Sequence, residues 1–120
     1  MPKTLLKFLL PFLLVSCEHS DYDVTKFTGD YRYYGGVAEF FDCQQQKKYY
    51  LADAGISTEL EELHTSLDIN ENDDIYIEVK GYYKEEQLME GIDPTMVFVP
   101  VGLLNHDINR GCNRSYRHGN

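Results

Sequence analysis

The hydrophobic and polar positions alternate most clearly over residues 75–84. Ile75, Ile77 and Val79 fall on one side of an extended chain, and polar or amphipathic residues lie between them. A period of two is typical of a strand with one buried face. The sequence therefore predicts a strand here, and Gly81 marks a point where it can bend.

A second β-type region covers residues 30–42, which we expect to form one long strand. The Gly35-Gly36 pair interrupts it and predicts a bulge or sharp bend, so that one strand serves both halves of a small closed sheet. The strand-forming residues of this region are Tyr31, Tyr33, Tyr34, Val37, Phe40 and Phe41.

Shorter β-type segments complete the pattern. Residues 47–52 predict a short strand, and residues 96–104 predict another that is broken by Pro100, which indicates an edge position or a bulge. Residues 87–89 are a candidate for a short extra strand.

One segment, residues 58–67, has helical periodicity. Thr58 and Glu61 stand at the spacing of a capping box, which predicts the start of the helix. His64 lies next to the apolar stripe and is expected to pack there rather than to bind a ligand. The stripe itself consists of Ile56, Leu60, Leu63 and Leu67.

These elements predict a mainly β fold, namely a small five-stranded OB-like barrel with one α-helix. Residues 68–74 are expected to form a polar turn. Their acidic spacing is similar to the start of a calcium-binding EF-hand loop, but Asp73 stands where that loop needs glycine and Val79 where it needs glutamate. A solvated turn is the better interpretation.

The N-terminus has the pattern of a signal peptide. Lys3 and Lys7 precede an apolar run over residues 8–15, which is too short to span a membrane and is followed at once by acidic residues. The sequence Leu14-Val15-Ser16-Cys17 resembles the lipobox of bacterial lipoproteins, in which the cysteine becomes the lipidated first residue. Plain secretion with an unmodified Cys17 is the alternative.

The lipobox resemblance implies a signal peptide over residues 1–16 and a palmitate-bearing, lipidated tether over residues 17–28. The OB-like domain would cover residues 29–112, followed by a flexible basic tail over residues 113–120. Glu18 is not the aspartate that retains many lipoproteins in the inner membrane, so the resemblance favours the outer membrane of a Gram-negative bacterium, on its periplasmic face.

The net charge narrows the possible partners. Removal of Lys3 and Lys7 with the signal peptide leaves nine basic residues against 20 acidic ones, a net charge of about −11. Such a surface repels nucleic acid and anionic headgroups. The basic residues cluster only near the C-terminus, at Arg110, Arg114, Arg117 and His118.

Three cysteines bear on the redox chemistry. With Cys17 lipidated, Cys43 and Cys112 remain as a pair in an oxidising compartment, which indicates a disulfide. Closing a loop of roughly 70 residues removes on the order of 4 kcal/mol of unfolded-chain entropy. The bridge would act as a structural staple or also report redox state, and two free thiols are the remaining alternative.

No pattern indicates an enzyme. The sequence has no glycine-rich phosphate loop, no His-Glu-x-x-His and no Cys-x-x-Cys, and its four histidines are far apart. We therefore predict no catalytic, cofactor-binding or metal-binding residues and no cofactor. A cleft shared by Glu39, Asp42 and His106 would be needed to support catalysis.

Ten tyrosines are many for a chain of this length. Adjacent residues in a strand point to opposite faces, so each tyrosine pair should place one ring in the core and one outside. The outer rings would form an aromatic patch that binds a protein partner or a sugar. The alternative is that the tyrosines have only a structural packing role. The pairs are Tyr33-Tyr34, Tyr49-Tyr50 and Tyr82-Tyr83.

The opening of the domain resembles one known family. Residues 29–43 are rich in tyrosine and end in Phe40-Phe41-Asp42-Cys43, which is similar to the start of the C-terminal OB-type domain of NlpE-like lipoproteins. Later parts of the chain follow the family's order, with a strand at 47–52, a helix at 60–67, Met89-Glu90-Gly91 and a late Cys112.

This resemblance implies an outer-membrane lipoprotein linked to envelope stress, with a Cys43–Cys112 disulfide that reports on oxidative folding. The family's additional N-terminal barrel with its Cys-x-x-Cys motif is not found in this sequence, so copper binding is not carried over.

We expect a non-enzymatic sensing or accessory role. The alternative is an acidic binding module, an inhibitor or assembly subunit, for an envelope protein. Either role implies a protein partner in addition to the lipid anchor.

Overall fold

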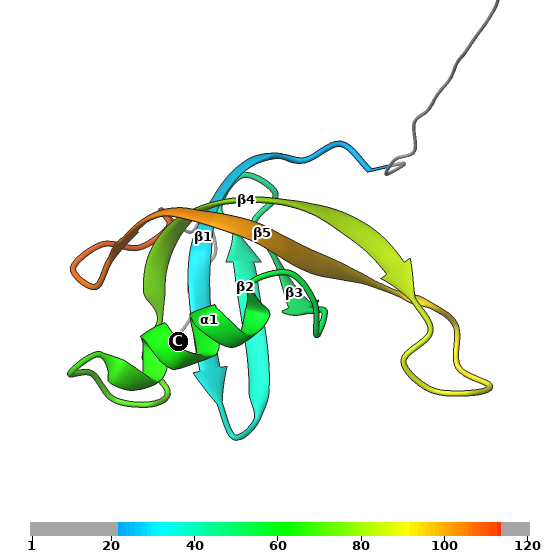
Figure 1. Cartoon of the computed structure of the whole chain (residues 1–120), viewed down its shortest axis with the longest axis horizontal. Coiled ribbons are helices and arrows are strands. Elements are labelled where there is room, and N and C mark those ends of the chain that lie inside the picture. The colour runs from blue at the N-terminus through cyan, green and yellow to red at the C-terminus, as the bar shows by residue number, and fades with distance from the viewer. Residues whose placement is uncertain (1–21, 114–120) are drawn as a thin grey trace, which may run out of the picture.

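The computed structural model describes residues 22–113, which form a closed five-stranded barrel with one helix (Figure 1). This confirms the predicted OB-like fold. The predicted signal peptide, Cys17 and residues 114–120 lie outside the described residues. The strands are β1 (Thr25–Tyr34), β2 (Val37–Asp42), β3 (Lys47–Leu51), β4 (Ile75–Glu86) and β5 (Thr95–Asp107), and the helix is α1 (Ser57–Ser66).

The region predicted as one long strand is a hairpin of two strands. Gly35 and Gly36 form the turn between β1 and β2, with φ angles of 64° and 82°. Two consecutive positive φ angles are the requirement of the tight turns that join antiparallel strands, and glycine meets it without steric cost. The prediction of a bend within one strand was therefore wrong, although the total of five strands was right.

The first strand also starts earlier than the sequence pattern indicated. The predicted tether ends at residue 28, whereas β1 begins at Thr25 and pairs with β4 from there on. The reason is Phe27, which packs edge-on against Phe98 and Tyr83 with ring centroids 5.4 and 5.3 Å apart. The partial burial of the Phe27 ring thus extends β1 into a segment of mostly polar residues.

The last two strands form a long, bent antiparallel pair. The register between β4 and β5 shifts twice, leaving Val101 and Leu104 as extra residues on β5, so the bulge predicted around Pro100 is confirmed. A side chain at Gly81, opposite Pro100, would clash with the Val99 carbonyl oxygen at 2.4 Å. Residues 87–89 lie in the connecting loop, and the predicted extra strand is wrong.

Helix α1 lies across one end of the barrel (Figure 1). The predicted stripe is confirmed, because Leu60 is 1% exposed and Ile56, Leu63 and Leu67 pack against the same core. The capping box is not formed: the helix is preceded by Ile56 and has no side-chain cap. Among residues 22–113, no helix is long and apolar enough to cross a membrane.

Aromatic rings fill the barrel. Phe40 and Phe98 stack at 4.5 Å between centroids, and the Tyr83 ring lies 5.1 Å from Phe98. Parallel pairing of β3 with β5, at Tyr50–Val97 and Leu51–Phe98, closes the sheet beside them. Side chains of the described strands therefore pack the interior of the barrel.

Two helix substitutions test the packing of α1. Leu60→Ala removes a fully buried side chain and should lower the free energy of unfolding by about 2–4 kcal/mol. Thr58→Ala should change it by less than about 0.5 kcal/mol, because Thr58 is exposed and caps nothing. Urea unfolding followed by circular dichroism measures both. A large loss in Thr58→Ala would show that the capping box forms after all.

Candidate functional site at the Cys43–Cys112 bridge

The turn after β2 is built around the buried carboxylate of Asp42. Its Oδ1 accepts hydrogen bonds from the backbone N–H groups of Gln44 and Gln45, at 2.8 and 3.0 Å. Its Oδ2 accepts from the Gln45 side chain at 3.2 Å and from the Tyr83 hydroxyl at 2.6 Å. The carboxylate therefore shapes residues 43–46 and ties them to β4.

Two tyrosine hydroxyls extend this network. Tyr83 donates to Asp42, and Tyr49 donates to the Gln45 side chain at 2.5 Å. Burial raises the pKa of Tyr83 well above its usual value of 10.0, and the hydrogen bond to the Asp42 carboxylate raises it further. Burial likewise raises the pKa of Tyr49. Both phenols thus remain donors at neutral pH.

The disulfide lies directly beside this turn. Cys43 and Cys112 are joined by a disulfide, with their Cα atoms 5.2 Å apart and a sequence separation of 69 residues. This confirms the predicted pairing. Both residues are half-buried. Lipidation at Cys17, the other cysteine site, stays a prediction.

A second buried carboxylate holds the other end of the bridge. Asp30 of β1 is 6% exposed and accepts hydrogen bonds from the Cys112 backbone N–H at 3.0 and 3.3 Å. The Gln46 side chain donates to the Asn113 carbonyl at 3.3 Å. The residues after β5, 108–113, are called the C-terminal strap below, because they are fastened across the barrel.

The strap covers an aromatic residue of the barrel. The Arg110 guanidinium lies 4.3 Å from the centre of the Tyr76 ring, and Tyr76 is buried. Arg110 was predicted to belong to a flexible basic cluster, and the structure instead places its guanidinium over the Tyr76 ring of β4. A cation above an aromatic face is a favourable contact. Disulfide, carboxylate and cation–π contact therefore fix the same segment.

The outer face of β1–β3 carries a mixed charge network. Arg32 pairs with Glu39 at 3.2 Å and with Asp74 at 3.6 Å, and Lys48 also pairs with Glu39. Exposed pairs of this kind contribute little to stability. Half-exposed Tyr34 and Tyr50 lie on the same face, as predicted for the outer members of their pairs. Tyr82 is an exception, because it packs against the small cluster of Ala52, Val97 and Val99.

The residues named for an enzyme do not meet. Glu39 faces outward from β2, Asp42 is buried on the opposite face of that strand, and His106 is exposed on β5. His64 packs as predicted: it is 3% exposed, contacts Tyr31 edge-on, and has Nε2 2.7 Å from the Asp73 carbonyl oxygen. No group of three potential metal ligands occurs among residues 22–113.

Comparison with known proteins identifies the kind of domain. Residues 22–113 match the family model of the NlpE C-terminal OB domain. The chain belongs to this family. The crystal structure of the Cpx pathway activator NlpE from Escherichia coli shares the fold, with a TM-score of 0.62 and 22% identity. That match covers 89% of this chain and 53% of the other, so this chain spans about half the length of its structural relative. No curated protein matches the chain.

Sequence reasoning named the bridge of this NlpE-type domain but missed its two carboxylates. Asp42 was named only in the family motif and in a catalytic cleft that does not form, and Asp30 was not singled out at all. An aspartate whose carboxylate can accept hydrogen bonds from N–H groups two and three residues later is a turn signal that could have revealed Asp42. Asp30 gives no such signal, because its partner lies 82 residues away.

Substitutions at the carboxylate turn should have graded effects. Asp42→Asn places an amide group against donors and should lower the free energy of unfolding by about 2 kcal/mol, and Tyr83→Phe by about 1 kcal/mol. Tyr31→Phe is the matched control, because the buried Tyr31 hydroxyl has no hydrogen-bond partner among the described residues. It should leave stability unchanged or raise it. Denaturant unfolding compares the three, and equal losses in both tyrosine variants would contradict the Asp42–Tyr83 contact.

Stability should also fall at alkaline pH. The pKa of Tyr83 is raised in the folded state, so the unfolded chain loses this proton first and stability drops as the pH rises above the ordinary tyrosine value of 10.0. Below that pH the contribution is complete. Tyr83→Phe should make the decline between about pH 10 and 12 shallower. Unfolding midpoints measured across this range test it, with the half-exposed Tyr50→Phe expected to follow the wild type.

Proposed function

We propose that this chain is an exported, non-enzymatic lipoprotein whose NlpE-type OB domain has a redox-sensing or accessory role in envelope stress. The signal peptide over residues 1–16 would be removed, and acyl chains on Cys17 would hold the domain on the periplasmic face of the outer membrane. The support comes from family membership, from the lipobox resemblance and from the Cys43–Cys112 bridge.

The observation that carries the sensing role is the position of the bridge. It connects the carboxylate turn after β2 to the C-terminal strap, which is also held by the contacts of Arg110, Cys112 and Asn113 described above. In the reduced protein only non-covalent contacts would hold the strap in place. They would have to outweigh the conformational entropy that the strap gains when it detaches. The redox state of one half-exposed disulfide is thereby coupled to the order of a defined segment.

An acidic binding module is the second candidate. The charge of −9 for the whole chain favours partners with basic surfaces. Half-exposed Tyr34 and Tyr50 on the outer face of β1–β3 are the kind of side chain that anchors protein interfaces. In this role the domain would cap an envelope protein, and affinity would fall as salt concentration rises.

Replacement of one bridging cysteine separates the two roles. Cys43→Ser should lower the free energy of unfolding by about 3–4 kcal/mol and should change envelope-stress output in the same direction as treatment of the wild type with reductant. Cys112→Ser should reproduce both effects. Gln44→Ser, in the same turn but using only its backbone N–H, is the control.

The measurement is a stress reporter in cells, read together with protein abundance. Unchanged output from Cys43→Ser at wild-type abundance, with and without reductant, copper or excess lipoprotein, would leave the sensing role without support. A stoichiometric partner that crosslinks equally to wild type and Cys43→Ser would then favour the binding module.

A further inference from the structure

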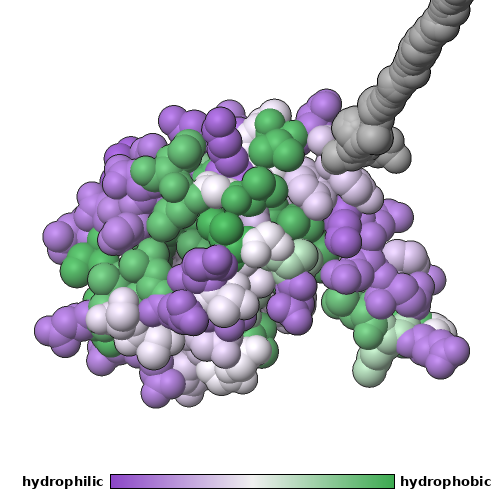
Figure 2. All heavy atoms as spheres, viewed as in Figure 1, coloured by the Kyte–Doolittle hydropathy of each residue, from purple (hydrophilic) through white to green (hydrophobic). Residues whose placement is uncertain are grey.

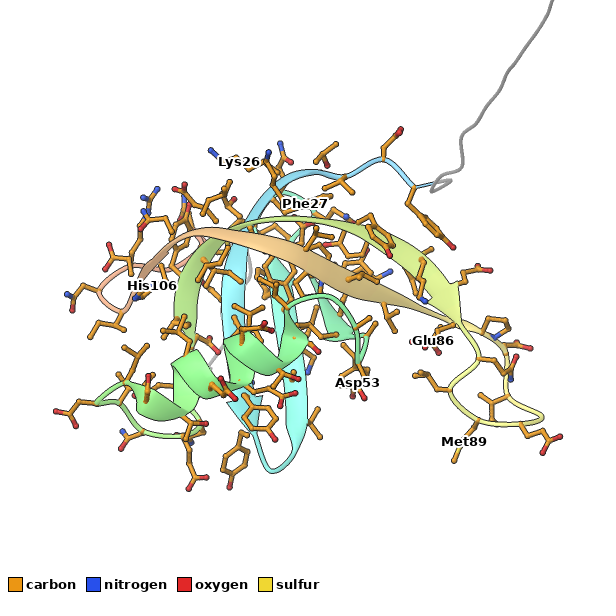
Figure 3. All side chains as sticks on the ribbon, viewed as in Figure 1. Lys26, Phe27, Asp53, Glu86, Met89 and His106 are labelled. Atoms are coloured by element: carbon orange, nitrogen blue, oxygen red, sulfur yellow. A yellow bond between two sulfur atoms is a disulfide. The ribbon has the colours of Figure 1, made fainter. Side chains whose placement is uncertain are left out.

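The β4–β5 hairpin extends beyond the barrel and ends in exposed hydrophobic side chains. Leu88, Met89 and Ile92 are 53%, 63% and 55% exposed, and Met89 lies at the tip (Figure 3). Figure 2 shows hydrophobic residues gathered at this end, separated from the main body. The barrel core does not need these side chains, since none of them packs against it.

The tip has a defined internal structure. The Gln87 side chain donates hydrogen bonds to the carbonyl oxygens of Met89 and Ile92, and the Ile92 N–H donates to the Met89 carbonyl at 3.2 Å. Gly91 has a φ of 82°, as such a tight loop requires. The loop therefore holds its apolar side chains together on the outside. Because the loop is already ordered, little further conformational entropy would be lost when these side chains bind to a surface.

The N-terminal end of the described chain runs towards the same tip. Thr25 pairs with Gly81 in an antiparallel register, so the residues before Thr25 continue along β4 in the direction of the hairpin. Tyr22 stacks on Tyr82 at 4.6 Å between centroids. Figure 1 shows the N-terminal segment and the hairpin at the same end of the molecule.

Chain length links this end to the anchor. Tyr22 lies five positions after Cys17, a reach of at most about 18 Å. The hairpin beyond Tyr82 has a similar length, because the four residues to Glu86 at about 3.3 Å each are followed by the loop. A lipid on Cys17 and the side chains of the tip can therefore reach one membrane surface together.

We infer that the hairpin tip, residues 87–92, is a second membrane contact that inserts Leu88, Met89 and Ile92 into the lipid interface beside the Cys17 anchor. This inference rests on the proposed lipidation. Alone, three apolar side chains would bind membranes weakly, but the acyl chains already hold the domain at the surface. The two contacts together fix the orientation of the barrel, with the Gly35-Gly36 turn and α1 available to the periplasm.

The charges of the hairpin define the kind of membrane. Its carboxylates oppose an anionic surface, and Lys84 is the basic residue of this region. The acidic residues are Glu85, Glu86, Glu90 and Asp93. A zwitterionic surface presents ammonium groups to them, so the tip should insert into phosphatidylethanolamine or phosphatidylcholine and retreat from an anionic lipid such as phosphatidylglycerol. This preference is opposite to that of basic peripheral proteins.

The absence of tryptophan from the chain allows a direct test. Met89→Trp and Val37→Trp each introduce a single reporter, the second at the exposed first residue of β2, next to the Gly35-Gly36 turn. Each lipidated protein is purified from membranes, its lipid on Cys17 is verified by intact mass, and it is placed in nanodiscs with brominated acyl chains. Emission wavelength and quenching are then compared in zwitterionic and phosphatidylglycerol-rich discs.

We expect the Met89→Trp emission to shift to shorter wavelength and to lose on the order of half its intensity in zwitterionic discs, as for side chains buried about 5–10 Å deep. Anionic discs should reduce that loss at least twofold, and Val37→Trp should not respond. A lipidated Met89→Trp protein without quenching overturns the membrane contact and leaves the anchor intact. A wavelength shift without quenching also overturns it, since the tip would then lie in a protein interface. A mass without lipid removes both proposals.

Discussion

The Asp42 carboxylate is the group on which the rest of the described structure depends most. It is almost completely buried, yet it accepts four hydrogen bonds from the turn and from Tyr83. A buried carboxylate is tolerable only when its oxygens are satisfied in this way. Because the next residue is Cys43, the geometry of the turn also determines the position of this half of the disulfide. The barrel core, the turn and the disulfide therefore depend on the same carboxylate.

The sequence could predict the parts of the fold that depend on local periodicity. Alternation over residues 75–84 and the stripe of Leu60 and its neighbours both come from repeated burial on one face, and both are present. It failed where one residue decides the outcome. Phe27 extends β1 into a polar segment, and the positive φ angles of Gly35-Gly36 turn one long strand into two.

The candidate site shows the same division. The cysteine count and the predicted compartment were sufficient to pair Cys43 with Cys112, because few alternatives exist for two residues. The contact of Asp30 with Cys112 and that of Arg110 with Tyr76 join residues that are far apart in sequence. Such contacts depend on how the strap returns across the barrel, and no local pattern of polar residues specifies that path.

The separation of the two bridging cysteines along the chain has a consequence for timing. In a chain exported from its N-terminus, Cys43 enters the oxidising compartment 69 residues ahead of Cys112. Strands β1 to β3 and α1 would emerge before the second thiol, and β5, which closes the barrel, directly precedes it. The bond can form correctly only once nearly the whole domain has been delivered. For a domain exported as proposed, its presence would therefore be a mark of completed translocation as well as of an oxidising environment.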